Sequence, residues 1–267
     1  MEGLGLIAKY IERDEDISRR EFFKRGTASA AGFLISYPEV NKHAEKVLVY
    51  PYDPIPKEKI AKLSAQANRE YKKISKSLGR DYNFGKIKIM ISNSFENIEA
   101  FFRVSQLRGT IRMPSPYVLN GVYATAHELT HIVADQSPVA AYFTEGLATN
   151  IQYNLGESKD SSPNLESNLH LAFRRTGLVN GQLKVPMSEL VSMESFHHKN
   201  KKHENKMHLH YQAASFVEYL INVWFGGNTR RFMPLYEKGG FQKHFGKNLE
   251  QLEKEWLEFV KNFAAKK

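Results

Sequence analysis

The sequence predicts an α+β protein whose strands lie in the first half and whose second half is helical. Short apolar runs typical of strands occur between residues 47 and 113, whereas apolar residues recur with helical spacing beyond residue 116. A hydrophobic content of 42% over 267 residues is ordinary for a globular chain with a substantial core. We therefore expect a small strand-bearing N-terminal lobe over residues 38–115 and a helical C-terminal lobe over residues 116–267.

The N-terminal lobe is predicted to contain three strands and two helices. The strands are expected at residues 47–50, 86–91 and 109–113, and the helices at residues 56–78 and 95–102. The longer helix repeats its apolar residues every three or four positions until Gly79, a residue that commonly ends helices. The strand at 109–113 could lie at the edge of the sheet.

The C-terminal lobe begins with a helical segment, residues 123–135, and further helices follow it. Amphipathic spacing and flanking Gly and Pro residues mark these later helices. They are expected at residues 165–174, 187–193, 210–225, 234–236, 241–245 and 249–263.

The segment from Tyr123 to Asp135 places three reactive side chains on one face of its predicted helix. His127 and His131 are four residues apart, so they lie one above the other with Glu128 beside them. Two imidazoles suit zinc, and the adjacent carboxylate could take a proton from a metal-bound water. Most flanking residues are Ala, Leu, Ile or Val, which is unusual around a solvated His–Glu pair.

A third ligand is expected on the next helix, which Ser137 and Pro138 are predicted to start. At about 1.5 Å per residue, His131 and Glu145 would both lie about 10 Å from the turn, so Glu145 can reach the same ion. Asp135, one turn beyond His131, is the alternative third ligand. Two histidines and one carboxylate leave the fourth zinc position open, as in catalytic sites, and we expect one Zn²⁺ per chain.

These motifs resemble those of the gluzincin, or peptidase MA-like, metallopeptidases, in which His-Glu-x-x-His is followed by Glu-Gly-x-Ala. Here the second motif runs from Glu145 to Ala148. The metzincin pattern does not fit, because positions that require Gly and His are occupied by Ala134 and Ser137. The resemblance implies a zincin-like fold, with the cleft between the two lobes. It also implies a zinc peptidase that hydrolyses peptide bonds by a metal-activated water, with Glu128 as general base.

The resemblance further implies a substrate-pairing strand and a donor for the developing oxyanion. The strand at 109–113 is the candidate for pairing with an extended peptide. Tyr211, at the start of a predicted helix, is the candidate donor, and His208 or His210 is the alternative. The surrounding segment, residues 196–210, is rich in His and Lys, and we expect it to form a solvated, pH-sensitive loop near the cleft.

The N-terminus resembles a twin-arginine export signal. Arg19 and Arg20 belong to a Ser-Arg-Arg-x-Phe-Phe-Lys sequence, and a weakly hydrophobic run of small residues follows at 26–37. We expect residues 1–37 to be this signal, and the protein to be periplasmic or extracellular, either free or tethered to the membrane. The alternative is a basic amphipathic helix of the folded body, in which case the protein would be cytoplasmic.

The charge and the cysteine content limit the possible partners. The formal net charge is +9, and residues 1–37 contribute nothing to it because they hold six basic and six acidic residues. The lysines are scattered without a nucleic-acid-binding motif, so we expect a solvated surface with at most weak association with anionic envelope surfaces. The chain has no cysteine, which excludes a cysteine zinc cluster and a lipoprotein anchor.

The main prediction is therefore a zinc metallopeptidase that acts on peptides or proteins. Two other classes stay open. One is a catalytically silent zinc-binding recognition module of the same fold, and the other is a basic surface-binding protein whose histidine motif is accidental. Glu128 favours the enzyme over the silent module, because zinc binding alone does not need this residue.

Overall fold

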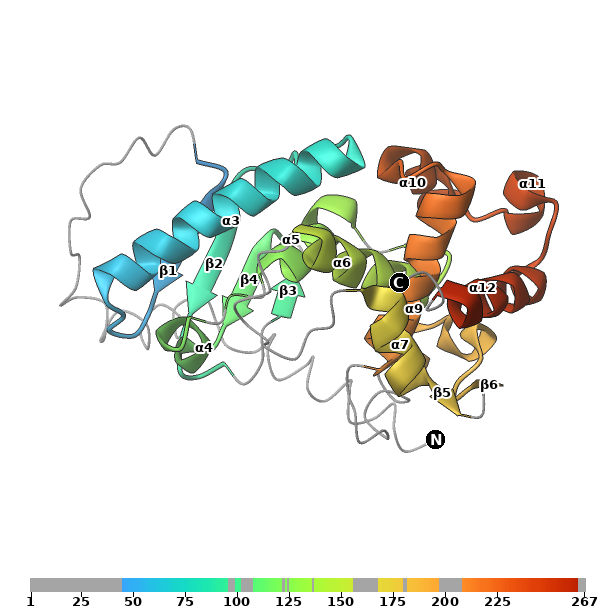
Figure 1. The fold of residues 1–267 in the computed structure, drawn as a ribbon. Helices are drawn as coiled ribbons and strands as arrows, with labels where there is room; N and C mark the ends of the chain where they lie inside the picture. Colours follow the sequence, from blue (N-terminus) through green and yellow to red (C-terminus); the bar gives the residue numbers. More distant parts are fainter. Residues whose placement is uncertain are drawn as a thin grey trace, which may run out of the picture. The chain divides into compact units, whose positions relative to one another are not determined.

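A computed structural model describes most of the chain beyond residue 44, and residues 45–267 form one compact unit. The described residues are 45–95, 99–101, 108–121, 123, 125–135, 137–155, 168–179, 182–196 and 208–263. The predicted export signal lies outside them. None of the described helices is long and apolar enough to cross a membrane. The described residues combine many helices with a four-stranded sheet and a two-stranded sheet, which confirms the α+β prediction (Figure 1).

The sheet has four strands in the order β1-β2-β4-β3. The strands are β1 (Val47–Pro51), β2 (Ile87–Ile91), β3 (Glu99–Phe101) and β4 (Thr110–Met113). The first two predicted strands are thus confirmed. β1, β2 and β4 are parallel, and β3 pairs antiparallel with β4. Ile87, Ile89 and Ile91 alternate along β2 as buried residues, so one face of the sheet packs on the core.

Two predictions about this sheet are wrong. Residues 99–101 form strand β3 instead of part of a helix at 95–102, because they pair with residues 110–112 of β4. For the same reason β4 is not an edge strand, since it lies between β2 and β3. Both errors concern contacts between strands that are distant along the chain.

Helix α3 (Lys57–Leu78) matches the predicted helix at 56–78 and packs on β1 and on helix α5. Gly79 ends it in the left-handed conformation, with a φ of 68°. Asn68 on α3 holds the start of β1, because its side chain accepts from the backbone N–H of Lys46 and Val47 at 3.0 Å and donates to the Val47 carbonyl at 2.8 Å.

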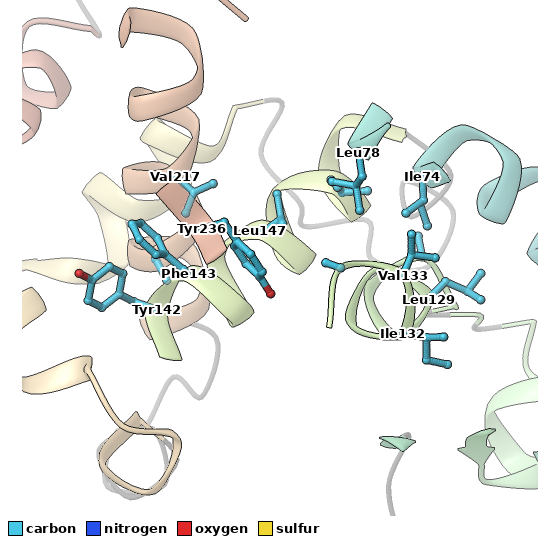
Figure 2. Close-up of a cluster of buried hydrophobic side chains, with 14 of the residues drawn as sticks. Ile74, Leu78, Leu129, Ile132, Val133, Tyr142, Phe143, Leu147, Val217 and Tyr236 are labelled. Carbon is cyan, nitrogen blue, oxygen red and sulfur yellow. The ribbon is translucent and has the colours of Figure 1, made fainter. Parts of the chain in front are cut away.

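The core continues from α3 through the two central helices, α5 (Thr125–Ala134) and α6 (Ala141–Leu155). Figure 2 shows apolar side chains of α3 and α5 on one side of this core and those of α6 and the C-terminal helices on the other. Helix α6 begins three residues later than predicted from Pro138. Ser137 does not cap it, because the helix starts four residues later; the Ser137 hydroxyl accepts from the Val139 N–H at 3.2 Å and donates to the Tyr236 carbonyl at 2.6 Å.

The rest of the chain is mainly helical, and several predicted helices are confirmed. The elements are α7 (Leu169–Gly177), β5 (Leu178–Val179), β6 (Gln182–Leu183), the 3₁₀-helix Met187–Leu190, α9 (His208–Tyr219), the π-helix Leu220–Trp224, α10 (Thr229–Lys238), α11 (Phe241–Phe245) and α12 (Leu249–Phe263). The predicted piece at 234–236 is part of the longer α10, which Asn228 caps. The hairpin of β5 and β6 was not predicted.

Candidate metal centre

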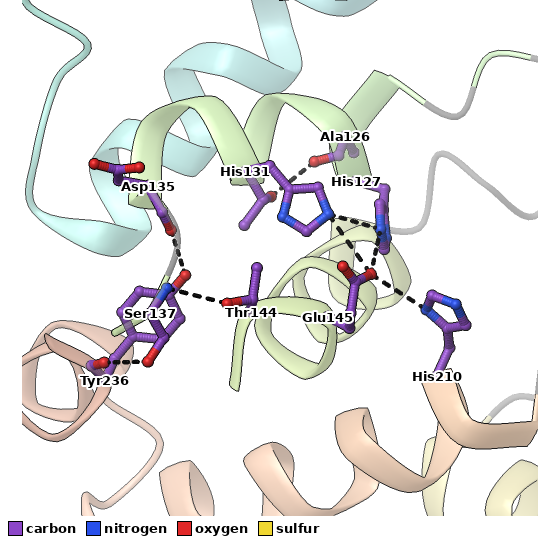
Figure 3. A network of polar contacts seen from close by, with 10 residues as sticks. Ala126, His127, His131, Asp135, Ser137, Thr144, Glu145, His210 and Tyr236 are labelled. Carbon is purple, nitrogen blue, oxygen red and sulfur yellow. Dashed lines mark hydrogen bonds and ion pairs between the residues drawn. The ribbon is translucent and has the colours of Figure 1, made fainter. Parts of the chain in front are cut away.

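Helix α5 brings two imidazoles into contact, as the four-residue spacing predicts. The Nε2 atoms of His127 and His131 lie 3.0 Å apart, and the two rings meet edge to face. Their side chains are only 14% and 8% exposed. Because the two ring nitrogens converge on one point in a largely desolvated region, they form a preformed pair of ligand atoms (Figure 3).

A buried carboxylate from α3 fixes the beginning of α5. Glu70 is 1% exposed and accepts hydrogen bonds from the Thr125 hydroxyl and, at 2.8 Å, from the Gln66 side-chain amide. Thr125 is the first residue of α5, where the helix dipole favours negative charge. Glu70 therefore holds the helix turn that carries His127. The sequence contains no motif that identifies this contact.

The end of α5 is fixed by two further contacts. The Arg80 guanidinium donates to the Ala134 carbonyl at 2.8 Å, and the Tyr236 hydroxyl donates to the Asp135 carbonyl. Asp135 has a φ of 61°, a left-handed conformation that ends the helix. Figure 3 shows the Asp135 carboxylate at the opposite end of α5 from His127 and directed away from the imidazoles.

Glu145 on α6 is the candidate for the third ligand. Its Oε2 lies 3.4 Å from His127 Nε2 and 3.7 Å from His131 Nε2, and the residue is 4% exposed. The next residue, Gly146, allows α6 to pack tightly on α9. A Cβ atom at this position would lie 2.6 Å from the Ala213 carbonyl oxygen. The absence of that atom allows the two helices to approach each other directly beside Glu145.

His210 on α9 lies beside these residues. The sequence motifs did not predict it as a ligand. Its Nδ1 lies 3.5 Å from Glu145 Oε2, and its ring centroid lies 5.9 Å from that of His127. The ligand atoms of His127, Glu145 and His210 all lie within 4.8 Å of one another. We call His127, His131, Glu145 and His210 the metal cluster.

The expected solvated loop at 196–210 is wrong at its C-terminal end, and residues 197–207 lie outside the described part. His208 and His210 belong to α9, and His208 is only 1% exposed. Tyr211 packs half-buried against the hydrophobic core, and its role as oxyanion donor stays a prediction.

Burial and charge act in opposite directions on the ionisable groups of the metal cluster. Burial alone would raise the pKa of Glu145, but the charges of His131, His127 and His210 outweigh it and hold this pKa well below its ordinary value. Burial alone would lower the pKa of His127, but the contact with Glu145 and the charge of half-buried Glu128 raise it. The cluster is therefore polarised toward an ionised carboxylate surrounded by imidazoles.

The contacts of Glu145 with the two histidines are longer than direct charge-assisted hydrogen bonds, whereas the 3.0 Å contact between His127 and His131 is within hydrogen-bond range. Charge-assisted N–H···O bonds are about 2.7–2.9 Å long, shorter than the 3.4 and 3.7 Å contacts of Glu145 with His127 and His131. Ligands about 2.05 Å from one zinc ion in tetrahedral geometry are about 3.4 Å apart. Nitrogen and carboxylate oxygen are both donors that zinc accepts, so the three predicted residues fit this ion.

No protein-family model, curated protein or solved structure matches this chain.

Proposed function

We propose that this chain is a zinc-dependent peptidase of gluzincin type with a zincin-like fold. The supporting observation is the position of Glu145. Its carboxylate comes from a different helix than the two histidines, yet it lies within 3.4 and 3.7 Å of their Nε2 atoms. The residues that the two sequence motifs identify are thus the same three residues that lie in contact. Such agreement is hard to obtain from a histidine motif that is accidental.

In the proposed reaction each residue has a separate task. His127, His131 and Glu145 would hold the ion, which supplies a Lewis acid and lowers the pKa of a water molecule. Glu128 would accept the proton of that water as general base. Glu128 is half-buried, and its negative charge contributes to the raised pKa of His127. The Glu128 carboxylate is therefore close enough to the site to interact with it electrostatically.

Strand β3 is the candidate for binding an extended peptide, in place of the predicted strand at 109–113. It is the last strand of the sheet order among the described strands, and it contacts α5. An edge strand binds peptide backbone by hydrogen bonds that do not depend on the peptide sequence. The proposed substrates are therefore peptides or proteins in extended conformation.

A catalytically silent zinc-binding module is the second candidate, and His210 favours it. A fourth protein donor beside the three predicted ligands is typical of closed, structural zinc sites. The two candidates differ in whether the zinc-loaded chain cleaves peptides. Glu128 distinguishes them further, because only the peptidase needs its carboxylate.

The deciding experiment combines zinc analysis with cleavage of a peptide library, with and without a chelator. The peptidase should bind one zinc per chain and cleave peptides only when zinc is present. Glu128→Gln should keep the zinc but lose about 10²–10⁴-fold in turnover, because an amide cannot accept the proton. A zinc-loaded chain that cleaves nothing would support the silent module. A chain without zinc would exclude both.

We also propose export by the twin-arginine route. This part of the proposal rests on Arg19 and Arg20. Replacing both with Lys preserves the charge but removes the arginine pair, so the protein should stay in the cytoplasm. Cell fractionation measures this directly. Unchanged export of the double variant would show that the pair is not a signal.

A further inference from the structure

We infer that His210 is a fourth protein ligand of the metal ion and binds it through Nδ1. The site would then offer three histidines and one glutamate to the ion, in place of the two histidines and one glutamate that the sequence motifs supply. This inference rests on the proposed zinc site. The inference goes beyond that site because the sequence motifs account for only three ligands and leave the fourth position open.

The distance from His210 to Glu145 is the first observation. His210 Nδ1 lies 3.5 Å from Glu145 Oε2, between the two distances from Glu145 to His127 and His131. All three contacts exceed the about 2.7–2.9 Å of a charge-assisted hydrogen bond and lie close to the about 3.4 Å that separates two tetrahedral zinc ligands. His210 thus stands in the same geometric relation to the carboxylate as the two expected ligands.

The second observation is that packing holds the His210 ring in place. Its side chain is 15% exposed, and its ring contacts the Phe196 ring edge to face, with 5.2 Å between centroids. Helix α9 approaches α6 closely because Gly146 has no side chain. The imidazole is therefore presented to Glu145 by two fixed elements and needs little reorganisation to bind an ion.

Such a site would restrain its own activity. His210 would occupy the position that a substrate carbonyl or a water molecule needs. Substrate binding would have to displace this imidazole before the reaction. The alternative role of His210 is a hydrogen-bond donor to the reacting carbonyl, in which case it does not bind the ion. The two roles predict opposite effects on turnover when the imidazole is removed.

The test compares wild-type protein with His210→Ala, and with His244→Ala as the control for loss of an exposed histidine on α11. Zinc affinity is measured by competition with a chromophoric chelator, and X-ray absorption counts the imidazoles around the ion. We expect three imidazoles in the wild-type protein and in His244→Ala, and two in His210→Ala. Zinc affinity should fall on the order of 10²–10³-fold in His210→Ala alone. Added imidazole should restore part of it.

Turnover at saturating zinc completes the test. Zinc-saturated His210→Ala should cleave peptide at least as fast as the wild-type protein. Unchanged zinc affinity and imidazole count, together with a turnover loss on the order of 10²–10³-fold, would assign His210 as a donor and overturn the inference. Wild-type protein that binds no zinc would instead overturn the proposed function. The two failures are therefore distinguishable.

Discussion

Two His–Glu clusters lie on different faces of helix α9, and they use the same residue types at the same spacing. In the metal cluster, His210 Nδ1 lies 3.5 Å from Glu145 Oε2. In the second cluster, His170 Nε2 lies 3.5 Å from Glu218 Oε2. We call the second group the enclosed cluster; it consists of His170, Ser215, Glu218 and Trp256. The pKa values of the two carboxylates are nevertheless shifted in opposite directions.

The ionisation of the two pairs is opposite. The pKa of Glu145 is lowered, because three imidazoles surround it and outweigh its burial. Burial raises the pKa of Glu218 to about 7 and lowers the pKa of His170 to about 4. A carboxylate with several cationic neighbours stays charged, whereas a carboxylate with one neighbour in an apolar environment tends to be neutral. In these two clusters, the number of imidazoles around the carboxylate thus decides whether it is charged, because the His–Glu distance is the same in both.

The enclosed cluster is surrounded by aromatic rings and is internally hydrogen-bonded. The Trp256 indole donates to the Ser215 hydroxyl at 3.0 Å, and that hydroxyl is also hydrogen-bonded to His170 Nδ1 at 2.8 Å. The rings of Phe259 and Phe263 lie 5.1 and 4.8 Å from the His170 ring. Ser, His and Glu in contact resemble a hydrolase triad, but Ser215 is completely buried and its hydroxyl is already engaged. This cluster therefore joins α7, α9 and α12.

The helical period assigns each cluster to its own face of α9. His210, Ala213 and Val217 are three to seven residues apart and face α6, as the contacts of Gly146 with Ala213 and Val217 show. Ser215 and Glu218 lie on the face toward α7. Tyr211 is four residues before Ser215 and therefore belongs to that second face. His210 is thus better placed than Tyr211 to reach the metal cluster.

The largest expected effect is the loss of zinc in Glu145→Ala. A structural zinc site contributes roughly 10–16 kcal/mol, so each of four ligands would be worth about 2.5–4 kcal/mol, or a change in affinity of about 10²–10³-fold. Chelator competition should show this loss. Glu218→Ala, which removes the matching carboxylate of the enclosed cluster, should leave zinc affinity unchanged. Normal zinc stoichiometry in Glu145→Ala would remove Glu145 from the site and leave His127, His131 and His210 as the candidate ligands.

The next effect is a pH dependence of stability that comes from Glu218. Its pKa of about 7 in the folded protein is above the ordinary value of 4.5, so the folded state retains the proton that the unfolded state releases. Stability is therefore fully present below pH 4.5 and is lost as pH rises toward and through 7, by up to about 3 kcal/mol. Urea unfolding of wild-type protein and Glu218→Gln should show the difference between them growing over this window. Parallel pH profiles would contradict the assignment.

The smallest of the three effects concerns the close contact between α6 and α9 at Gly146. Gly146→Ala would place a Cβ 2.6 Å from the Ala213 carbonyl oxygen and 2.9 Å from Val217 Cγ2. Overpacking of this kind costs about 2 kcal/mol, and it should also weaken zinc binding because α6 carries Glu145. Thermal unfolding and chelator competition measure the two parts. Adding Val217→Ala should not restore stability, because the nearest clashing atom belongs to the backbone.

Local patterns predicted the elements whose signals are contained in one segment. The helices at 56–78, 241–245 and 249–263 follow from apolar spacing and from flanking Gly or Pro residues, and the observed bounds agree closely. The spacing of His127 and His131 is likewise a property of a single helix. Glu145 was selected because a motif and a short connection placed it near them.

The missed features depend on contacts between distant segments. The strand at 99–101 forms because β4 pairs with it, which no local pattern contains. His210 is 65 residues beyond Glu145 and reaches it through the α6–α9 packing that Gly146 permits. Glu70 is 55 residues before Thr125, and its burial depends on the position of α3 against α5. Such contacts need the tertiary arrangement and cannot be predicted from spacing.

Both ends of α5 are held from the N-terminal part of the chain, by Glu70 on α3 and by Arg80 just beyond it. His127 and His131 therefore lie on a helix that is anchored to α3, whereas Glu145 and His210 lie on α6 and α9. An ion bound by all four would act as a cross-link between segments that are otherwise joined by packing and by a few polar contacts, such as those of Tyr236 with the Asp135 carbonyl and of Arg80 with Glu237. Its removal would weaken the connection between these two groups of helices, so the metal would raise the cooperativity of unfolding.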